Sequence, residues 1–458
     1  MIEETKKKNG TLDMTEGNPF TLILQFGLPL LFGLLFQQLY NMVDTIIVGK
    51  VLGKEALAAV GCTGSINFMI IGFCIGICNG FAIPVAQSFG AKDNDNLKKF
   101  ITNCAWAGVF FSTVITVLVC IFARDILVLM DTPESILNDA HSYIFVIFLG
   151  IPLIFLYNVT SGILRSLGNS IMPLVFLIFS SLMNIVLDLI LIKPMGVAGA
   201  AVATISAQGA AGIICLFYMF FKYRHLNFTR GDWRFSGRHA LKLSSMGLPM
   251  GLQYSITAIG SIILQTSVNN LGEDIIAAVA ASIKVNMFLC CPFDAMGSTM
   301  ATYGGQNVGA GKLDRIGKGL GSCVKIGAFY SVISFAIMFF FGKELALLFV
   351  DKSETVIIER MYEYMLANGI SFFLLCLVNS VRFMIQGLGF PGLAVIAGIC
   401  EMFARGIAGF VLVPTFGYVF VTFASPLAWV FADCFLVPAY FGCMRVLKKR
   451  QNEHSKRI

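Results

Sequence analysis

The first half of this chain reads Gly27-Leu28-Pro29, then Gly53, then Ala58-Ala59-Val60, then Gln87-Ser88-Phe89-Gly90-Ala91. The second half repeats this order as Gly247-Leu248-Pro249, Gly272, Ala277-Ala278-Val279 and Gln306-Asn307-Val308-Gly309-Ala310. The first motif recurs after 220 residues and the other three recur after 219. Four matches in register over that distance indicate a tandem duplication whose units are far longer than solenoid repeats. In a membrane protein, a duplication of this size is typical of two halves that enclose a site between them.

Composition places the chain in a membrane. Of its 458 residues, 57% are hydrophobic and only 13% are charged, whereas soluble domains are about 25% charged. Twelve apolar segments are long enough to span a bilayer, which takes about 20 residues per helix. We therefore predict an all-α polytopic membrane protein with twelve transmembrane helices. The predicted spans are 20–48, 56–88, 98–122, 136–163, 169–193, 196–222, 241–268, 276–306, 318–341, 356–387, 391–413 and 419–446.

Six spans fall in each half, so both halves have the same orientation. This predicts two pseudo-symmetric six-helix bundles related by a parallel repeat. The N-terminal bundle covers 20–222 and the C-terminal bundle covers 241–446. A basic inter-bundle loop at 223–240 joins them, and a helix lying on the membrane surface is one structure open to it. Polar segments at 1–19 and 447–458 flank the bundles.

Basic residues predict the orientation. Lys and Arg gather at both termini and in the connections after even-numbered spans, including Lys6-Lys7-Lys8, the 222–242 stretch and Lys448-Lys449-Arg450. The positive-inside rule assigns these regions to the cytoplasm. We therefore expect a multi-pass protein of the cytoplasmic (inner) membrane with both termini in the cytoplasm. Contact with anionic headgroups explains the net charge of +7 without a nucleic-acid partner.

The 13 Cys and four His do not form a metal-binding pattern. The Cys are scattered without a CxxC pair, and His141, His225, His239 and His454 do not cluster. We expect reduced cysteines, no structural metal and no cofactor. No Ser/His, HExxH or GxSxG pattern supports an intramembrane enzyme.

Two carboxylates inside apolar spans of the first half call for an explanation. Inserting an acid into the centre of a membrane helix costs about 2.5–3.5 kcal/mol of free energy on insertion scales. The two acids are Asp44 and Asp188. Each acid shares a helix face with two polar residues. Gln37 and Asn41 accompany Asp44, and Ser181 and Asn184 accompany Asp188. Thr204 and Gln208 form a similar polar stripe on the 196–222 span. If these helices bundle, the stripes converge on a site for a proton or for Na⁺. The alternatives are a polar network that only joins helices and, for Asp44, a side chain that reaches an interface.

The second half carries different polar residues. Its candidate cavity-lining residues are Gln253, Thr257, Lys284, Asn379 and Arg382. Lys284 either pairs with Asp294 or lines the cavity. Glu401 and Arg405 are four residues apart, and we interpret them as a mutually neutralised salt bridge. No role follows for Asp433.

Small residues and prolines add structural expectations. Gly72, Gly76 and Gly80 recur every four residues, which predicts close helix packing. Pro29 lacks an N–H group and predicts a kink in the span that carries Asp44.

Together these features resemble the multidrug and toxic compound extrusion (MATE) transporters over almost the whole chain. The resemblance rests on the two bundles, the Gly-Leu-Pro opening of each half and the Gln-x-x-Gly-Ala turn after the second and eighth spans. It also rests on Asn184-x-x-x-Asp188 before Gly196-x-x-Gly199-Ala200-Ala201. The resemblance implies that the protein exchanges amphipathic, often cationic compounds for H⁺ or Na⁺. Resemblance to the DinF-like branch of the family further implies an ion-binding network at Asp44, Asp188 and Asn184.

The chain departs from the NorM-type branch, which uses acids in the seventh and tenth spans. Here those stretches read Gln253-Tyr-Ser-Ile-Thr257 and Asn379-Ser-Val-Arg382. We therefore expect a secondary antiporter, coupled through the N-terminal bundle alone, that exports small organic cations by alternating access as a monomer. The alternative is a lipid-linked oligosaccharide or lipid flippase of the same superfamily, which Arg165, Lys284, Arg382 and Arg405 keep open.

Overall fold

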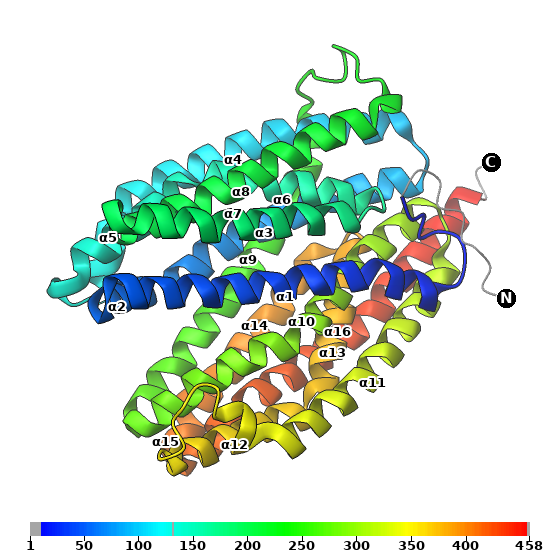
Figure 1. Ribbon diagram of the computed structural model, residues 1–458. Coiled ribbons are helices and arrows are strands. Elements are labelled where there is room, and N and C mark those ends of the chain that lie inside the picture. Colours follow the sequence, from blue (N-terminus) through cyan, green and yellow to red (C-terminus); the bar gives the residue numbers. More distant parts are fainter. Residues whose placement is uncertain (1–10, 131, 456–458) are drawn as a thin grey trace. The chain divides into compact units, whose positions relative to one another are not determined.

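The computed structural model describes residues 11–130 and 132–455. The first half of the chain folds into helices named in Figure 1. They are α1 (Pro19–Leu52), α2 (Lys54–Cys62), α3 (Gly64–Gly90), α4 (Asn94–Leu129), α5 (Glu134–Leu149), α6 (Ile151–Ser166), α7 (Ile171–Met195), α8 (Val197–Lys222) and the 3₁₀ turn η1 (Arg224–Leu226).

The second half is built from a matching series. It comprises α9 (Gly237–Val268), the 3₁₀ turn η2 (Asn269–Leu271), α10 (Glu273–Gly309), α11 (Leu313–Ala346), α12 (Thr355–Ile370), α13 (Phe372–Gly387), α14 (Pro391–Ile407), the π-helical turn η3 (Ala408–Leu412), α15 (Val413–Phe416) and α16 (Tyr418–Ser455).

The prediction of an all-α membrane protein with twelve spans is confirmed. Ten helical spans are long and apolar enough to cross a bilayer, and two bent helix pairs bring the number to twelve among the described residues. The pairs are α5–α6, bent by 45°, and α12–α13, bent by 51°. The first bend lies at Gly150, two residues before Pro152, whose ring removes a backbone donor. The segment predicted as one span at 56–88 is divided at Thr63 into α2 and α3.

The backbone repeats the duplication seen in the sequence. Gly53 and Gly272 both precede a helix with a positive φ, 89° and 101° respectively. Glycine adopts this conformation without the steric clash that a Cβ atom would create. Three further pairs of positive-φ residues recur at nearly the same displacement, and they are Lys92 and Gly311, Gly168 and Gly389, and Gly196 and Gly417.

The described residues form two compact units whose borders differ from those of the repeats. Unit 1 contains residues 11–13 and Leu28–Gly251, and unit 2 contains residues 14–27 and Leu252 onward. Helix α1 therefore begins in unit 2 and continues in unit 1, whereas α9 begins in unit 1 and continues in unit 2. Each Gly-Leu-Pro motif lies close to the point where its helix changes unit.

Both ends of the chain contact the same turn of unit 2, between α10 and α11. The Lys312 ammonium donates to the Thr15 carbonyl over 3.0 Å, and the Gln451 amide donates to the Gly311 carbonyl over 2.8 Å. The termini therefore lie at one end of this unit, as an even number of spans requires. Lys6, Lys7, Lys8, Lys456 and Arg457 lie outside the described residues.

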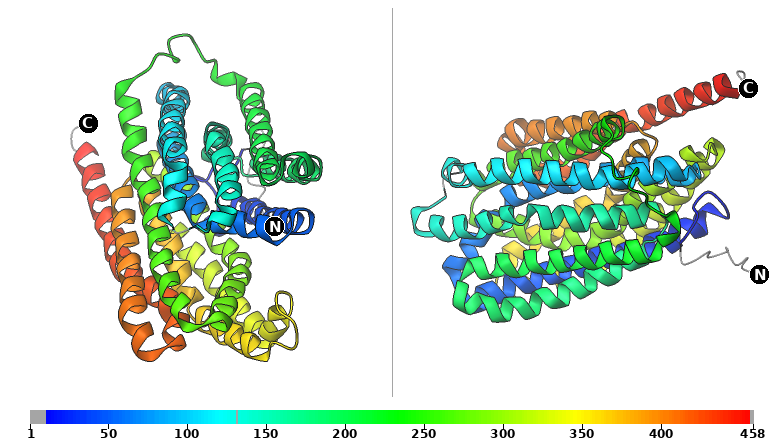
Figure 2. Two further views of the ribbon diagram at one scale, coloured as in Figure 1. Left: turned by 90° about the vertical axis from the view of Figure 1, so that its left-hand side faces the viewer. Right: turned by 90° about the horizontal axis from the view of Figure 1, so that it is seen from above.

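The inter-bundle loop is not a surface helix. Beyond the single turn η1 it is an open segment, drawn in green in Figure 2, and α9 begins at Gly237 rather than at 241. Hydrogen bonds to α4 fix this segment. The Thr102 hydroxyl donates to the Asp232 carbonyl over 2.6 Å, and the Trp106 indole donates to the Trp233 carbonyl over 3.0 Å. The loop residues from Leu226 onward therefore pack as part of unit 1.

Glycines allow α3 and α9 to touch within unit 1, as the four-residue spacing predicts. A Cβ atom on Gly80 would lie 2.5 Å from Gly247 Cα, and one on Gly76 would lie 2.6 Å from the Met250 carbonyl oxygen. Both obstacles are backbone atoms, which cannot rotate away. These two helices are therefore in direct backbone contact.

We expect Gly80→Ala to lower stability by about 1–3 kcal/mol, because overpacking forces the two backbones apart. Thermal unfolding of the purified protein in detergent measures the effect. Gly64→Ala is the matched control in the same helix, since its Cβ would meet nothing within 4 Å. Equal melting temperatures for the two variants would contradict the close contact.

Candidate functional site

The centre of the candidate site is a pair of carboxyl groups in unit 1. Asp44 on α1 and Asp188 on α7 lie within hydrogen-bonding reach of each other. Asp188 is 0% exposed, and neither of its oxygens accepts a hydrogen bond from a described donor. Two carboxylates in such contact repel each other unless a proton or a cation lies between them. The pair can therefore hold one of these.

Amide and hydroxyl groups of α7 and α8 lie beside the acids. The Asn184 amide nitrogen donates to the Thr204 hydroxyl over 3.3 Å, which leaves the Asn184 carbonyl oxygen buried without a described donor. The Ser181 hydroxyl instead donates to the Leu177 carbonyl within its own helix, over 2.8 Å. Asn184 thus presents a second acceptor group one helical turn from Asp188.

A tyrosine connects the polar residues of α1 and α8. Tyr40 lies near the side chains of Gln37 and Gln208 and interacts electrostatically with Asp44. Asn41, on the same helix, has an exposed side chain. Gln37 and Gln208 therefore both lie near Tyr40, a residue that the sequence pattern did not single out. Its position one helical turn before Asp44 is the signal that could have identified it.

A second overlooked residue is Tyr143 on α5. It is buried and interacts electrostatically with Asp44, Asp188 and Tyr40. No spacing signal in the sequence marks Tyr143, because its own span carries no polar stripe that leads to it.

Unit 2 arranges its polar residues as pairs. The Gln386 amide donates to the Gln253 side-chain oxygen over 2.8 Å, and the Asn379 amide donates to the Asp294 carboxylate over 3.0 Å. The Thr257 hydroxyl donates to the Gln253 carbonyl of its own helix.

Lys284 is exposed and forms no ion pair with an acid of the described chain. The alternative that Lys284 pairs with Asp294 is therefore wrong. The two residues are ten positions apart on one helix and do not share a face.

Buried charges of unit 2 also neutralise one another. Glu401 forms an ion pair with Arg382 and a second with Arg405, the latter at 3.5 Å. The expected pair of Glu401 and Arg405 is thus confirmed, and Arg382 joins it from α13. Asp433 on α16 is 8% exposed, interacts electrostatically with Arg382 and accepts no hydrogen bond from a described donor.

No group of three or more His, Cys, Asp or Glu side chains in the described part of the chain is arranged to hold a metal ion. All 13 Cys are free thiols. The side chains of His225 and His454 lie outside the described set. The two acids of unit 1 therefore stand out because they face each other without a neutralising partner.

The family model MatE matches residues 29–190 and again residues 249–411. The chain belongs to the MATE family. The two matches coincide with the duplicated halves, and together they cover most of the chain. Members of this family are transporters, so the protein is a membrane transporter rather than an enzyme.

Relatives of this MATE transporter carry multidrug-resistance names. The "Probable multidrug resistance protein YpnP" of Bacillus subtilis is 29% identical, over 82% of this chain and 86% of that protein. The "FAD transporter" of Shewanella oneidensis is 24% identical, over 79% and 80%. In fold, the chain resembles the outward-facing structure of a multidrug resistance MATE family transporter, with a TM-score of 0.88, 24% identity and coverage of 98% and 100%.

We expect Glu401→Gln to destabilise this MATE transporter by about 3–5 kcal/mol, because it leaves two buried guanidinium groups without a counter-charge. Thermal unfolding in detergent is the measurement. Glu363→Gln is the control, since its ion pair with Arg360 is exposed and such pairs contribute about 0–1 kcal/mol. A melting temperature of Glu401→Gln equal to that of the control would show that the arginines do not depend on Glu401.

Proposed function

We propose that this MATE transporter is a secondary antiporter that exports amphipathic cationic compounds in exchange for H⁺ or Na⁺. The observation that carries the proposal is the contact of the Asp44 and Asp188 carboxyl groups in the interior of unit 1. A bound proton or Na⁺ would remove the repulsion between them. The oxygens of Asn184 and Thr204 would complete the coordination of a Na⁺ ion.

Helix α1 would transmit the state of this site. It carries Asp44 in unit 1, while its residues before Leu28 belong to unit 2. Pro29 lies between these parts and weakens the helical ladder there. A cation that draws Asp44 toward Asp188 would therefore act on a helix that both units share, and alternating access would follow from two positions of α1.

Coupling would reside in unit 1, as in the DinF-like branch. In unit 2, the residues proposed to line a substrate cavity are Gln253, Thr257, Lys284, Asn379 and Arg382, which offer amide, hydroxyl and basic groups. Arg382 is neutralised by Glu401. The many Phe and Met residues provide soft apolar surface suited to varied substrates.

The protein would be a monomer in the cytoplasmic (inner) membrane. The basic connections favour an orientation with both termini in the cytoplasm. Its only bound ions would be the exchanged H⁺ or Na⁺, without an additional cofactor.

We expect Asp188→Asn to lower gradient-driven export at least tenfold, because a neutral amide cannot exchange the coupling cation. The assay is efflux of a fluorescent organic cation from proteoliposomes, with either a pH gradient or a Na⁺ gradient imposed alone. The gradient that drives wild-type efflux identifies the coupling ion.

The control for this experiment is Asp125→Asn, which removes an exposed acid of α4 in the same unit. It should leave efflux unchanged under both gradients. If Asp188→Asn transports at the wild-type rate under both gradients, the acid pair is not the coupling site.

An anionic substrate is the second candidate, because one relative is a FAD transporter and FAD carries a diphosphate. A flippase for lipid-linked oligosaccharides would also need a basic site. The charges of unit 2 weigh against both, since its buried acids Glu401 and Asp433 equal Arg382 and Arg405 in number and leave no net positive charge among its buried charged residues. Efflux of a flavin nucleotide, with no efflux of organic cations, would favour the anionic substrate.

A further inference from the structure

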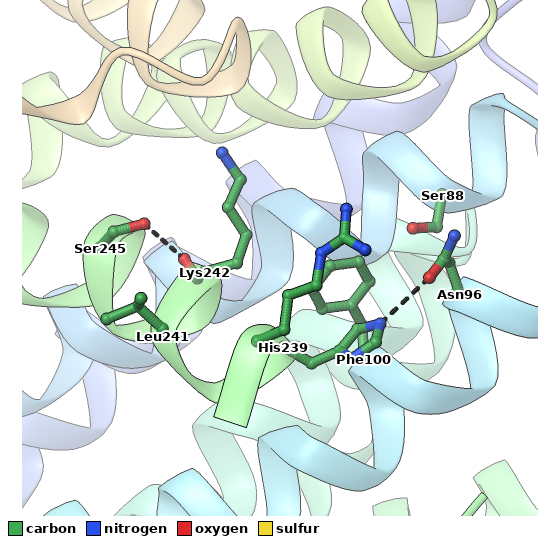
Figure 3. A pocket seen from close by; sticks show the side chains of 8 residues that line it. Ser88, Asn96, Phe100, His239, Leu241, Lys242 and Ser245 are labelled. Atoms are coloured by element: carbon green, nitrogen blue, oxygen red, sulfur yellow. Dashed lines mark hydrogen bonds between the residues drawn. The ribbon is translucent and has the colours of Figure 1, made fainter. Parts of the chain in front are cut away.

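A pocket of about 500 Å³ lies in unit 1 where the ends of three helices meet (Figure 3). Ser88 at the end of α3 and Asn96 and Phe100 at the start of α4 form one wall. The first two turns of α9 form the other, with Arg238 and Lys242 among their side chains. This end of unit 1 also carries the inter-bundle loop, so the proposed orientation places the pocket at the cytoplasmic leaflet.

Hydrogen bonds fix the two walls to each other. The Asn96 side-chain amide donates to Asp93 over 2.7 Å, so the Asn96 oxygen faces His239 Nε2, which lies 3.0 Å away and must donate (Figure 3). The other ring nitrogen of His239 lies 2.7 Å from the Ser236 hydroxyl. Both nitrogens of His239 are therefore occupied within the protein. His239 positions α9 on α4 and leaves any ligand to the other side chains.

The charge of the pocket is positive. Arg238 and Lys242 line it, Lys99 interacts electrostatically with His239, and no acid is among the lining residues. Arg238 forms no ion pair with any described acid. The nearby Asp93 carboxylate is occupied, because the backbone N–H and amide of Asn96 both donate to it and hold its pKa below the usual range.

A serine in the lining offers a further donor to a ligand. Ser88 is only 7% exposed as a residue, lines the pocket, and forms no side-chain hydrogen bond with another described residue. An oxyanion in the pocket would accept a hydrogen bond from Ser88 and charge-assisted bonds from Arg238 and Lys242.

We propose that this pocket binds the phosphodiester headgroup of an anionic phospholipid. The apolar surroundings favour a lipid over a free phosphate. Leu241, also in the lining, is 72% exposed, and Phe235, Trp233 and Trp106 are exposed on the docked loop and on α4 of the same unit. Tryptophan at this level is typical of a membrane interface, and basic pockets between helices on the cytoplasmic side suit acidic headgroups.

The test is a titration of phosphatidylglycerol into purified, delipidated full-length protein in neutral detergent, with bound lipid counted by native mass spectrometry. We expect the double variant Arg238→Ala/Lys242→Ala to weaken binding about tenfold or more, since each basic group near a headgroup contributes substantially. Ser88→Ala keeps the net charge and should weaken binding about two- to tenfold through the lost hydrogen bond.

The matched control is Arg230→Ala/Arg234→Ala, which removes the same charge from the inter-bundle loop just before α9, outside the pocket lining. It should bind lipid like the wild type. Equal losses in the two double variants would mean diffuse attraction and overturn the proposal, as would displacement of the lipid by millimolar inorganic phosphate. Unchanged melting temperatures in lipid-free detergent would show that the variants fold. Because binding is measured without transport, the result is independent of the exchange reaction.

Discussion

A charge inside an apolar helical bundle must be neutralised, and the two units of this transporter meet this constraint in different ways. In unit 2, Glu401 neutralises the arginines Arg382 and Arg405 through ion pairs within the protein. In unit 1, Asp44 and Asp188 face each other, and neither acid has a basic partner within the described chain. The arginines of unit 2 thus have an acid within the protein, whereas the acids of unit 1 have no basic partner among the described residues. This asymmetry supports the proposal that the coupling cation binds in unit 1.

The position of Asp44 on α1 gives that event mechanical consequences. At Gly33 of α1 an added Cβ atom would meet two leucines of α7 only at ordinary contact distance, so the α1 backbone does not touch a neighbouring backbone there. By contrast, α9 contacts α3 backbone to backbone at Gly76 and Gly80. Packed interfaces without free space respond as rigid bodies. The equivalent first helices of the two repeats thus differ in how closely they pack at these glycines within unit 1, and the less tightly packed one carries the acid.

Much of the fold could be predicted because apolar length and repeat register are properties of the sequence itself. The bend at Gly150 is signalled by Pro152 two residues later, whereas no proline marks the bend at Ser371, which the sequence did not predict. In the site, Asp188, Asn184 and Thr204 were predictable from helical spacing. Tyr143 was not, because its electrostatic interaction with the acids depends on how α5 packs against other helices. The ion pair of Arg382 with Glu401 likewise joins two helices, and no spacing within one helix reveals it.

The repeat also explains why unit 2 has no copy of the acid pair. The flanking glycines, Gly196 and Gly417, align with a displacement of 221, which places Gly409 at the position of Asp188 and Arg405 at that of Asn184. A Cβ atom on Gly409 would lie 2.8 Å from the Ser267 hydroxyl, so even alanine is crowded there. Arg405 occupies the polar position instead and requires an acid one turn away, which Glu401 supplies. In unit 2 the carboxylate of Glu401 thus contacts two arginines, and the acid pair that we propose to bind the coupling cation has no copy there.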